Sequence, residues 1–235
     1  MEPDRTLIVV PTYNERQNVE PLITQLLQVA PAADVLLVDD NSPDGTASYV
    51  QQKFGGNSRV SVLKRTGARS FGRSLLDGYR AAVERGYARL VQLDADFSHD
   101  PNMIPVIIAA SRDADLVIGS RYCVGGRVEN WPARRELLSR FANRYVAFIT
   151  GLDVRDSTAG FRCWTRRALE SLLHTGVASE GYAFQVETAF RTSQAGLRIV
   201  EIPITFTDRR AGQSKMSGQV IFESVAKPWA LRFGR

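Results

Sequence analysis

The chain has 235 residues, of which 44% are hydrophobic and 23% charged, and its formal net charge at pH 7 is +5. This length is typical of a globular domain with one core, so we expect a single domain over residues 1–235. The basic excess predicts an anionic partner, such as a phosphorylated ligand, nucleic acid or an acidic lipid surface. The sequence contains no signal-peptide pattern and no apolar stretch long enough to span a membrane. We therefore expect a cytoplasmic protein that contacts membranes only peripherally.

Apolar segments of strand length alternate with helical patterns through the first half of the chain. The expected strands are residues 6–10, 34–38, 60–63, 90–93 and 115–119. The expected helices are residues 17–30, 44–54, 70–86 and 101–112. Near-continuous apolar strands joined by helices are typical of a mostly parallel sheet that is covered on both faces. We predict a doubly wound α/β fold with ligands at the carboxyl ends of its strands.

The second half of the chain has a less regular pattern. It predicts helices at 133–150, 166–174 and 184–196 and a strand at 198–206. Asp44, Ser70 and Asp100 are the expected N-caps, and Gly86 the expected end of a helix. Residues 218–235 mix apolar and basic side chains, so they predict an amphipathic helix that either lies on a membrane surface or packs on the core. Pro228 is expected to kink or end it.

Polar clusters directly follow three expected strands, at residues 11–15 (PTYNE), 39–46 (DDNSPDGT) and 94–99 (DADFSH). In an extended backbone, Asp94 and Asp96 point to the same face, where both could bind one divalent cation or a metal-bound diphosphate. Carboxylate oxygens suit Mg²⁺ or Mn²⁺. The alternative is that one aspartate caps the next helix and the other is solvated. We interpret His99 as a hydrogen-bonding loop residue rather than a ligand.

Several motifs together resemble the family 2 glycosyltransferases, which have the GT-A fold with a Rossmann-like nucleotide-binding half. These motifs are PTYNE, VDDNSPDGT, the DAD triplet, GSRY and RRAGQSKMS. The motifs NWPARRELLSR, DSTAGFR and GYAFQVE, with the G-x-S-K segment, narrow the resemblance to polyprenyl-phosphate (dolichyl-phosphate) mannose synthases. The resemblance implies transfer of mannose from GDP-mannose to a polyprenyl phosphate, with inversion at the sugar and with Mg²⁺ or Mn²⁺ as cofactor.

The resemblance also implies roles for individual residues. Those implied to bind the nucleotide sugar are Pro11, Tyr13, Glu15, Val38, Asp40, Asp94, Ala95, Asp96, Arg121, Arg209 and Lys215. The implied metal ligands are Asp94, Asp96 and Ser98, the last standing where many relatives carry glutamine. Arg135 and Ser139 would receive the acceptor phosphate, and Asp96, Arg121 and Arg209 are the implied catalytic residues. The basic segment 208–218 is predicted to close over the donor diphosphate.

The chemistry of such a transfer explains the basic residues. A phosphate acceptor is already anionic, so the reaction needs no general base to remove a proton from it. It requires groups that hold two repelling anions together and stabilise the departing diphosphate, which a metal and arginines supply. The alternatives are another donor such as UDP-glucose, a sugar nucleotidyltransferase, and a nucleic-acid-binding module. The acidic cluster at the sheet edge would repel a nucleic-acid backbone, which argues against a nucleic-acid-binding module. The sequence leaves open whether the protein also binds a separate membrane partner protein.

Overall fold

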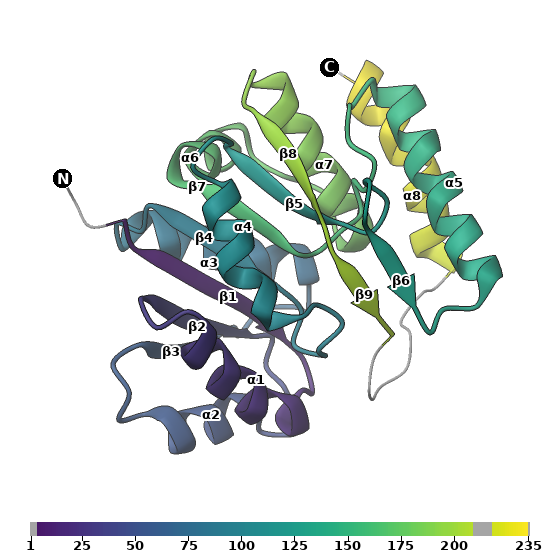
Figure 1. Cartoon of the computed structure of the whole chain (residues 1–235). Helices are drawn as coiled ribbons and strands as arrows, with labels where there is room; N and C mark the ends of the chain where they lie inside the picture. The colour runs from purple at the N-terminus through teal and green to yellow at the C-terminus, as the bar shows by residue number, and fades with distance from the viewer. Residues whose placement is uncertain (1–3, 209–217, 235) are drawn as a thin grey trace.

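A seven-stranded sheet forms the centre of the computed structural model, which describes residues 4–208 and 218–234 (Figure 1). The strands lie in the order β3 (Val60–Lys64), β2 (Ala33–Asp39), β1 (Thr6–Thr12), β4 (Arg89–Gln92), β7 (Arg162–Thr165), β5 (Leu116–Ser120) and β8 (Ile199–Pro203). Neighbouring strands are parallel except at β7, which is antiparallel to both β4 and β5. The predicted, mostly parallel α/β architecture is therefore confirmed.

Helices cover both faces of this sheet because successive side chains of a buried strand point to opposite faces. On β1, Leu7 and Val9 pack in one apolar cluster with α3, α6 and α7. Ile8 and Val10 pack in a second cluster with α1, α2 and α4. The helices are α1 (Arg16–Val29), α2 (Thr46–Phe54), α3 (Phe71–Glu84), the 3₁₀ turn η1 (Pro101–Met103), α4 (Ile104–Ala110), α5 (Ala133–Thr150), α6 (Arg166–Thr175), α7 (Gly181–Gln194) and α8 (Gly218–Phe233).

Two of the three predicted N-caps are confirmed. The Ser70 hydroxyl accepts a hydrogen bond from the Arg73 backbone N–H at 3.0 Å, and Asp100 accepts one from the Asn102 N–H at 2.9 Å. Gly86, with φ at 74°, follows the end of α3 as predicted. Asp44 is not the N-cap of α2, because Gly45 takes that position in a left-handed conformation.

The predicted strand over 198–206 is wrong in one respect, because it is divided between two sheets. Its first part is β8, and its second part is β9 (Thr205–Thr207), which pairs in parallel with β6 (Arg127–Glu129). Ile204 lies between them: its N–H donates to the Ser120 carbonyl, and its own carbonyl accepts from the Arg127 N–H, both at 3.0 Å. The chain therefore passes at Ile204 from the large sheet to the small one.

The C-terminal helix α8 lies against α5 and α7 (Figure 1). Pro228 is buried inside this helix and does not end it. Lys227 forms an ion pair of 3.3 Å with the buried Glu187 of α7. Trp229 donates to the Tyr145 hydroxyl of α5 at 2.7 Å. Part of α8 thus packs on the rest of the protein, which was one of the two alternatives expected for residues 218–235.

Candidate active site

The first two polar clusters meet at the carboxyl ends of β1 and β2. The Thr12 hydroxyl donates to the buried Asp39 carboxylate at 3.2 Å. The Asn14 backbone N–H donates to the Ser42 hydroxyl at 3.0 Å. The Glu15 N–H likewise donates to a side chain of the second cluster, the Thr46 hydroxyl, at 3.1 Å. Since β4 pairs with β1, the third cluster also lies at this edge of the sheet.

Asp40 directly follows β2, and its carboxylate is held from two sides. Its carboxylate accepts hydrogen bonds from the Arg65 guanidinium and from the Ser70 backbone N–H, the latter at 2.7 Å. Arg65 also donates through Nε to Asp77 of α3 at 2.8 Å. The Val38 side chain, by contrast, is fully buried in the apolar cluster beneath α3, so any ligand contact at Val38 would come from its backbone.

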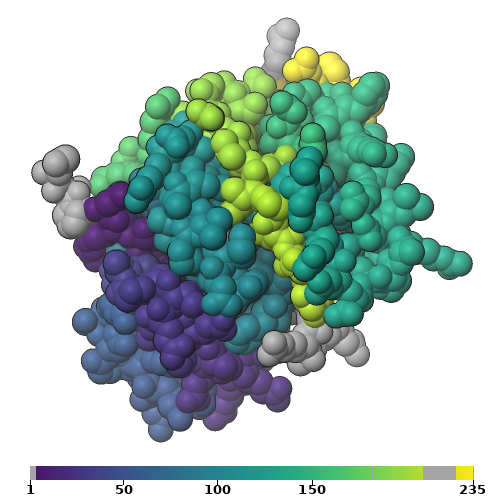
Figure 2. All heavy atoms as spheres, viewed as in Figure 1, coloured from purple at the N-terminus to yellow at the C-terminus, as the bar shows by residue number. Residues whose placement is uncertain are grey.

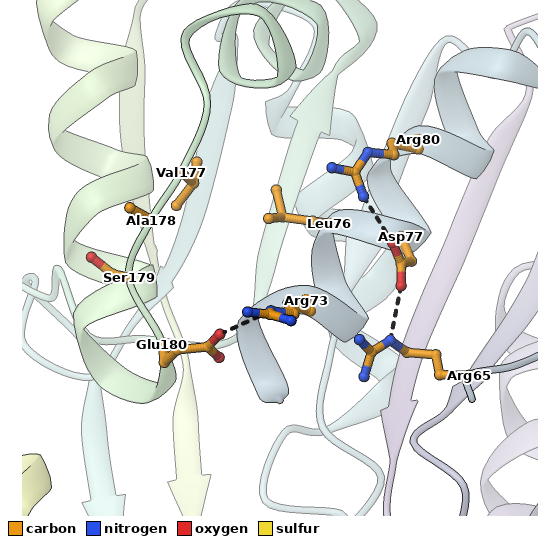
Figure 3. Close-up of a pocket in the computed structure, with 9 residues that line it drawn as sticks. All are labelled: Arg65, Arg73, Leu76, Asp77, Arg80, Val177, Ala178, Ser179 and Glu180. Carbon is orange, nitrogen blue, oxygen red and sulfur yellow. Dashed lines mark hydrogen bonds and ion pairs between the residues drawn. The ribbon is translucent and has the colours of Figure 1, made fainter. Parts of the chain in front are cut away.

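A pocket of about 320 Å³ lies beside this network, between α3 and residues 177–180 (Figure 3). Its charged side chains are paired with one another. Asp77 accepts from Arg65 and Arg80, each at 2.8 Å, and Glu180 pairs with Arg73 at 3.5 Å. The residues that line the pocket include none of the predicted site residues. Arg65, which holds Asp40, is one of the residues that line it.

The DAD triplet lies just past the end of β4. Asp96 is 7% exposed, and its Oδ1 accepts from the Ser98 backbone N–H at 3.1 Å and from the Ser98 hydroxyl. Ala95 packs in the apolar cluster on the α1 face of the sheet. Gly160 lies over Asp94 so closely that a Cβ at this glycine would be 3.3 Å from Asp94 Oδ2. Gly160 of the DSTAGFR motif thus lies directly beside the Asp94 carboxylate.

His99 supports the turn at residues 94–98 through a hydrogen bond and two ring contacts. Its Nδ1 lies 3.4 Å from the Asp94 backbone N–H, from which it accepts a hydrogen bond. Its ring stacks on Phe161, with centroids 5.6 Å apart, and meets the Phe206 ring edge-on at 5.2 Å. Burial lowers the pKa of His99 to about 4, so the imidazole is neutral at pH 7. His99 is a hydrogen-bonding loop residue, as predicted.

The carboxylates of Asp94 and Asp96 fit a hard divalent cation whose remaining coordination positions are filled by other ligands. In residues 4–208 and 218–234, no group of three or more His, Cys, Asp or Glu side chains is placed to hold a metal ion. Two carboxylates alone suit an ion that completes its coordination with substrate phosphates and water. Gly160 supports this fit, because any larger residue would crowd Asp94.

Arg121 follows β5 and is fixed by Asp156 of the DSTAGFR motif. Its Nε and Nη2 donate to the two Asp156 oxygens at 2.7 and 2.6 Å, and its backbone N–H donates at 2.9 Å. The Asp156 side chain is fully buried. Three aromatic rings surround the guanidinium with centroids 5.1 to 5.5 Å away, those of Tyr122, Trp131 and Phe206. Arg121 is therefore a cation held rigidly in an aromatic enclosure.

Arg162 fixes the same motif from inside the protein. It is fully buried, and its guanidinium donates to the carbonyls of Ser157, Ala159 and Gln185 at 2.8 to 2.9 Å. Burial lowers its pKa to about 10, which still leaves it charged at pH 7. Sequence reasoning missed Asp156 and Arg162 as individual residues, although the motif that contains both was noted.

The two predicted acceptor-phosphate residues lie one turn apart on α5. Arg135 Nη1 is 3.1 Å from both carboxylate oxygens of Asp208, and its guanidinium lies 3.9 Å from the centroid of the Trp131 ring. Ser139 is four residues further on, on the same side of the helix. Arg209 and Lys215, and nearly all of the predicted closing segment, lie outside the described residues.

Comparisons with known proteins identify the family of the chain. The model of the "Glycosyl transferase family 2" matches residues 7–173. An undecaprenyl-phosphate mannosyltransferase from Micrococcus luteus is 42% identical over 94% of this chain and 91% of its own length. A polyprenol monophosphomannose synthase from Mycolicibacterium smegmatis is also 42% identical, over 97% of this chain and 88% of its own.

Solved structures share the fold at low sequence identity. Glucosyl-3-phosphoglycerate synthase from Mycobacterium tuberculosis, in complex with Mn²⁺, UDP and glucosyl-3-phosphoglycerate, has a TM-score of 0.74 and 18% identity, covering 99% of this chain and 81% of that one. A mannosyltransferase from Pyrobaculum calidifontis, in complex with GDP-mannose and Mn²⁺, has a TM-score of 0.59 and 16% identity, covering 98% and 70%. With the family model and both relatives in agreement, the chain belongs to glycosyl transferase family 2.

Proposed function

We propose that this protein transfers mannose from GDP-mannose to a polyprenyl phosphate lipid and inverts the configuration at the sugar. The observation that carries the proposal is the 42% identity with two relatives, named as mannosyltransferases acting on such lipids, over nearly the whole chain. The acidic edge formed by Asp94 and Asp96 and the basic groups Arg121 and Arg135 supply the charges that such a reaction needs.

The donor nucleotide lies at the carboxyl edge of the sheet in this proposal. Tyr13 and Asp40 meet the nucleoside, with Pro11, Glu15 and the backbone of Val38 completing its pocket. Asp94 and Asp96 hold Mg²⁺ or Mn²⁺, with Ser98 as the third ligand; in the structure its hydroxyl is hydrogen-bonded to Asp96. The metal, when bound, neutralises the charge of the departing diphosphate. Arg209 and Lys215 are proposed to contact the same diphosphate.

The acceptor phosphate binds at α5 through Arg135 and Ser139. It enters the reaction as an anion, so the residues need only orient it and offset its charge. Arg121, fixed by Asp156, supplies a positive charge whose position does not depend on the ligand, and it acts on the phosphates of the reacting pair. Asp96, Arg121 and Arg209 are the catalytic residues of this proposal.

Exposed apolar side chains gather on the outer side of α5 and α8, and we propose that they contact the lipid surface. Among the side chains that the structure describes on these helices, the large exposed hydrophobic ones are Leu137, Leu138, Phe141, Phe148, Trp229 and Phe233. Arg134 and Arg144, both exposed, lie on the same helix as Phe141. A face of aromatic and basic side chains suits an anionic bilayer surface. No helix within the described residues is long and apolar enough to cross a membrane.

This face also lies close to the proposed acceptor site. In the space-filling view, the band formed by β8 and β9 separates the part built by the first half of the chain from the part that contains α5 (Figure 2). Arg135 lies on α5 itself and pairs with Asp208, which directly follows β9. A lipid phosphate at the bilayer surface would therefore approach the donor from the α5 side. The cytoplasmic face of the membrane is the side on which we propose that this reaction takes place.

One assay tests the reaction. The purified protein is incubated with a short polyprenyl phosphate, Mg²⁺ or Mn²⁺, and either GDP-mannose or UDP-glucose, and the glycolipid is identified by mass spectrometry. We expect a mannolipid from GDP-mannose only when both metal and acceptor are present. A glucolipid from UDP-glucose would identify another donor, whereas GTP formed from GDP-mannose and diphosphate would identify a nucleotidyltransferase.

Sedimentation with anionic vesicles tests the membrane face. We expect the double substitution Phe141→Ser and Phe148→Ser to reduce the bound fraction several-fold, because each removes an exposed apolar ring. Val106→Ser on α4 is the matched control, since Val106 is 48% exposed but lies on a different helix. Equal binding by all three proteins would exclude this face as the docking surface.

A further inference from the structure

The segment between β3 and α3, residues 65–70, is attached at both ends to one carboxylate. Arg65 at its start donates a hydrogen bond to Asp40 Oδ1. Ser70 at its end donates to Asp40 Oδ2 through its backbone N–H at 2.7 Å. Ser70 also caps α3, and Arg65 is anchored on Asp77 of the same helix at 2.8 Å (Figure 3). The two ends of this segment are therefore fixed beside the proposed nucleoside site.

Arg69 lies within this segment, over the ring of Tyr13. Its guanidinium carbon is 3.9 Å from the ring centroid. Within the described part of the chain, no hydrogen bond or ion pair involves this guanidinium, which contrasts with Arg65 and its two carboxylate partners. A guanidinium that stacks on a ring keeps its N–H donors directed outward in its own plane. Arg69 thus presents hydrogen-bond donors beside Tyr13, at the edge of the sheet where the paired strands β1 and β2 end.

We infer that Arg69 recognises the base of the donor nucleotide and selects guanine over uracil. This inference rests on the proposed function, in which Tyr13 and Asp40 line the nucleoside pocket. Guanine presents two adjacent acceptors, O6 and N7, to which the planar arginine fork donates with matching geometry. Uracil has no N7, and adenine presents an amino donor where guanine has O6. A donor-only side chain therefore favours guanine over both.

The first test measures binding of GDP, UDP and ADP, each with Mn²⁺, by calorimetry. We expect Arg69→Ala to weaken GDP binding by about 5- to 150-fold, the range for one bidentate contact with a base. UDP binding should change less than about threefold. Arg69→Lys keeps the charge but not the fork, so it should lose the preference for GDP as well. Arg73→Ala is the control: it removes the charge of another exposed arginine, at the start of α3, and should leave all three affinities unchanged.

The second test removes a single acceptor atom from the ligand. 7-Deaza-GDP lacks N7, so the wild-type protein should bind it several-fold more weakly than GDP. In Arg69→Ala the two nucleotides should bind equally, because the donor that reads N7 is absent. Unchanged thermal denaturation of the variant would show that the fold is intact.

The results distinguish this inference from the proposed function. If Arg69→Ala weakens GDP and UDP equally, Arg69 acts through charge on the diphosphate and the inference is wrong. It is equally wrong if wild-type protein prefers GDP and the variant keeps that preference. If the wild-type protein itself prefers UDP and makes glycolipid from a UDP-sugar, then the proposed donor is wrong, whatever Arg69 does.

Discussion

Arg135 and Asp208 form an ion pair in which one guanidinium nitrogen lies 3.1 Å from both carboxylate oxygens. Both side chains are about one-third exposed, at 32% and 34%. Arg135 is the residue proposed to receive the acceptor phosphate, so Asp208 occupies part of its donor capacity and places a negative charge beside it. An incoming phosphate has to displace this carboxylate or bind next to it.

We therefore expect Asp208→Asn to lower the KM for polyprenyl phosphate. A pair this exposed contributes about 0.2–1 kcal/mol, so the change should not exceed roughly fivefold. Steady-state kinetics at saturating GDP-mannose measure it. In an Arg135→Ala background the same substitution should have little effect, because the guanidinium for which Asp208 and the acceptor phosphate compete is absent. A raised KM in Asp208→Asn would mean instead that the carboxylate positions Arg135 for binding.

The metal site is tested by Asp96→Asn, which keeps the shape of the side chain and its contact with Ser98. The amide is a poor ligand for a hard cation, so the increase in GDP affinity caused by Mn²⁺ should disappear. Calorimetry of GDP binding with and without Mn²⁺ measures this difference. Asp113→Asn, at an exposed position, serves as the control. If Mn²⁺ still strengthened GDP binding to Asp96→Asn, Asp96 would not be a ligand.

The buried pair of Arg121 and Asp156 should contribute to stability as well as to activity. Asp156→Asn leaves the Arg121 guanidinium, which is 8% exposed, without its counter-charge. Removing one partner of a buried pair costs about 3–5 kcal/mol of unfolding free energy. Urea denaturation followed by circular dichroism checks this value. Arg135→Ala should cost less than about 1 kcal/mol in the same experiment, since that pair is exposed.

The two cysteines should differ in reactivity. Burial in the core raises the pKa of the Cys163 thiol to about 12, whereas Cys123 is only half-buried. In the native protein at pH 8 we expect a thiol reagent to label Cys123 alone, and both residues after unfolding. Rapid labelling of two thiols in the native state would show that β7 is not stably buried.

The same shift predicts a loss of stability in alkali. An unfolded thiol ionises near its ordinary pKa of about 9, while the folded Cys163 stays protonated until about 12. The unfolded state therefore binds fewer protons above pH 9, and stability falls between pH 9 and 12. Urea midpoints measured across this range should fall more steeply for the wild type than for Cys163→Ala.

The first half of the fold could be predicted from sequence because its signals are local. The strands around Ile8 and Leu36 are continuously apolar, as burial on both faces requires, and each ends in a polar cluster. Their parallel pairing then follows from the helices between them. The convergence of Thr12, Asp39 and Asn14 at one edge needed only the rule that strand ends meet there.

The rest depended on contacts between distant residues. β7 has four residues and is held by β4 and β5, which lie far from it in the chain. Arg162 in this strand is charged, which locally favours a surface position. Its burial is made acceptable by acceptors from two distant segments, the carbonyls of the 156–160 turn and the Gln185 carbonyl and Thr188 hydroxyl of α7. The ion pair of Asp208 with Arg135 and the stacking of Arg69 on Tyr13 could not be predicted, because each joins residues that are distant in the chain.

The position of β7 has a consequence for synthesis of the protein on the ribosome. Both sheet neighbours of β5, β7 and β8, come later in the chain. The apolar strand LVIGS therefore emerges with no partner strand and waits, at roughly 5–20 residues per second, on the order of seconds for β7. A ribosome that pauses before Arg162 would hold this strand exposed to solvent. We expect such nascent chains to be bound by chaperones at this stage, and chains released after Thr165 to be bound less.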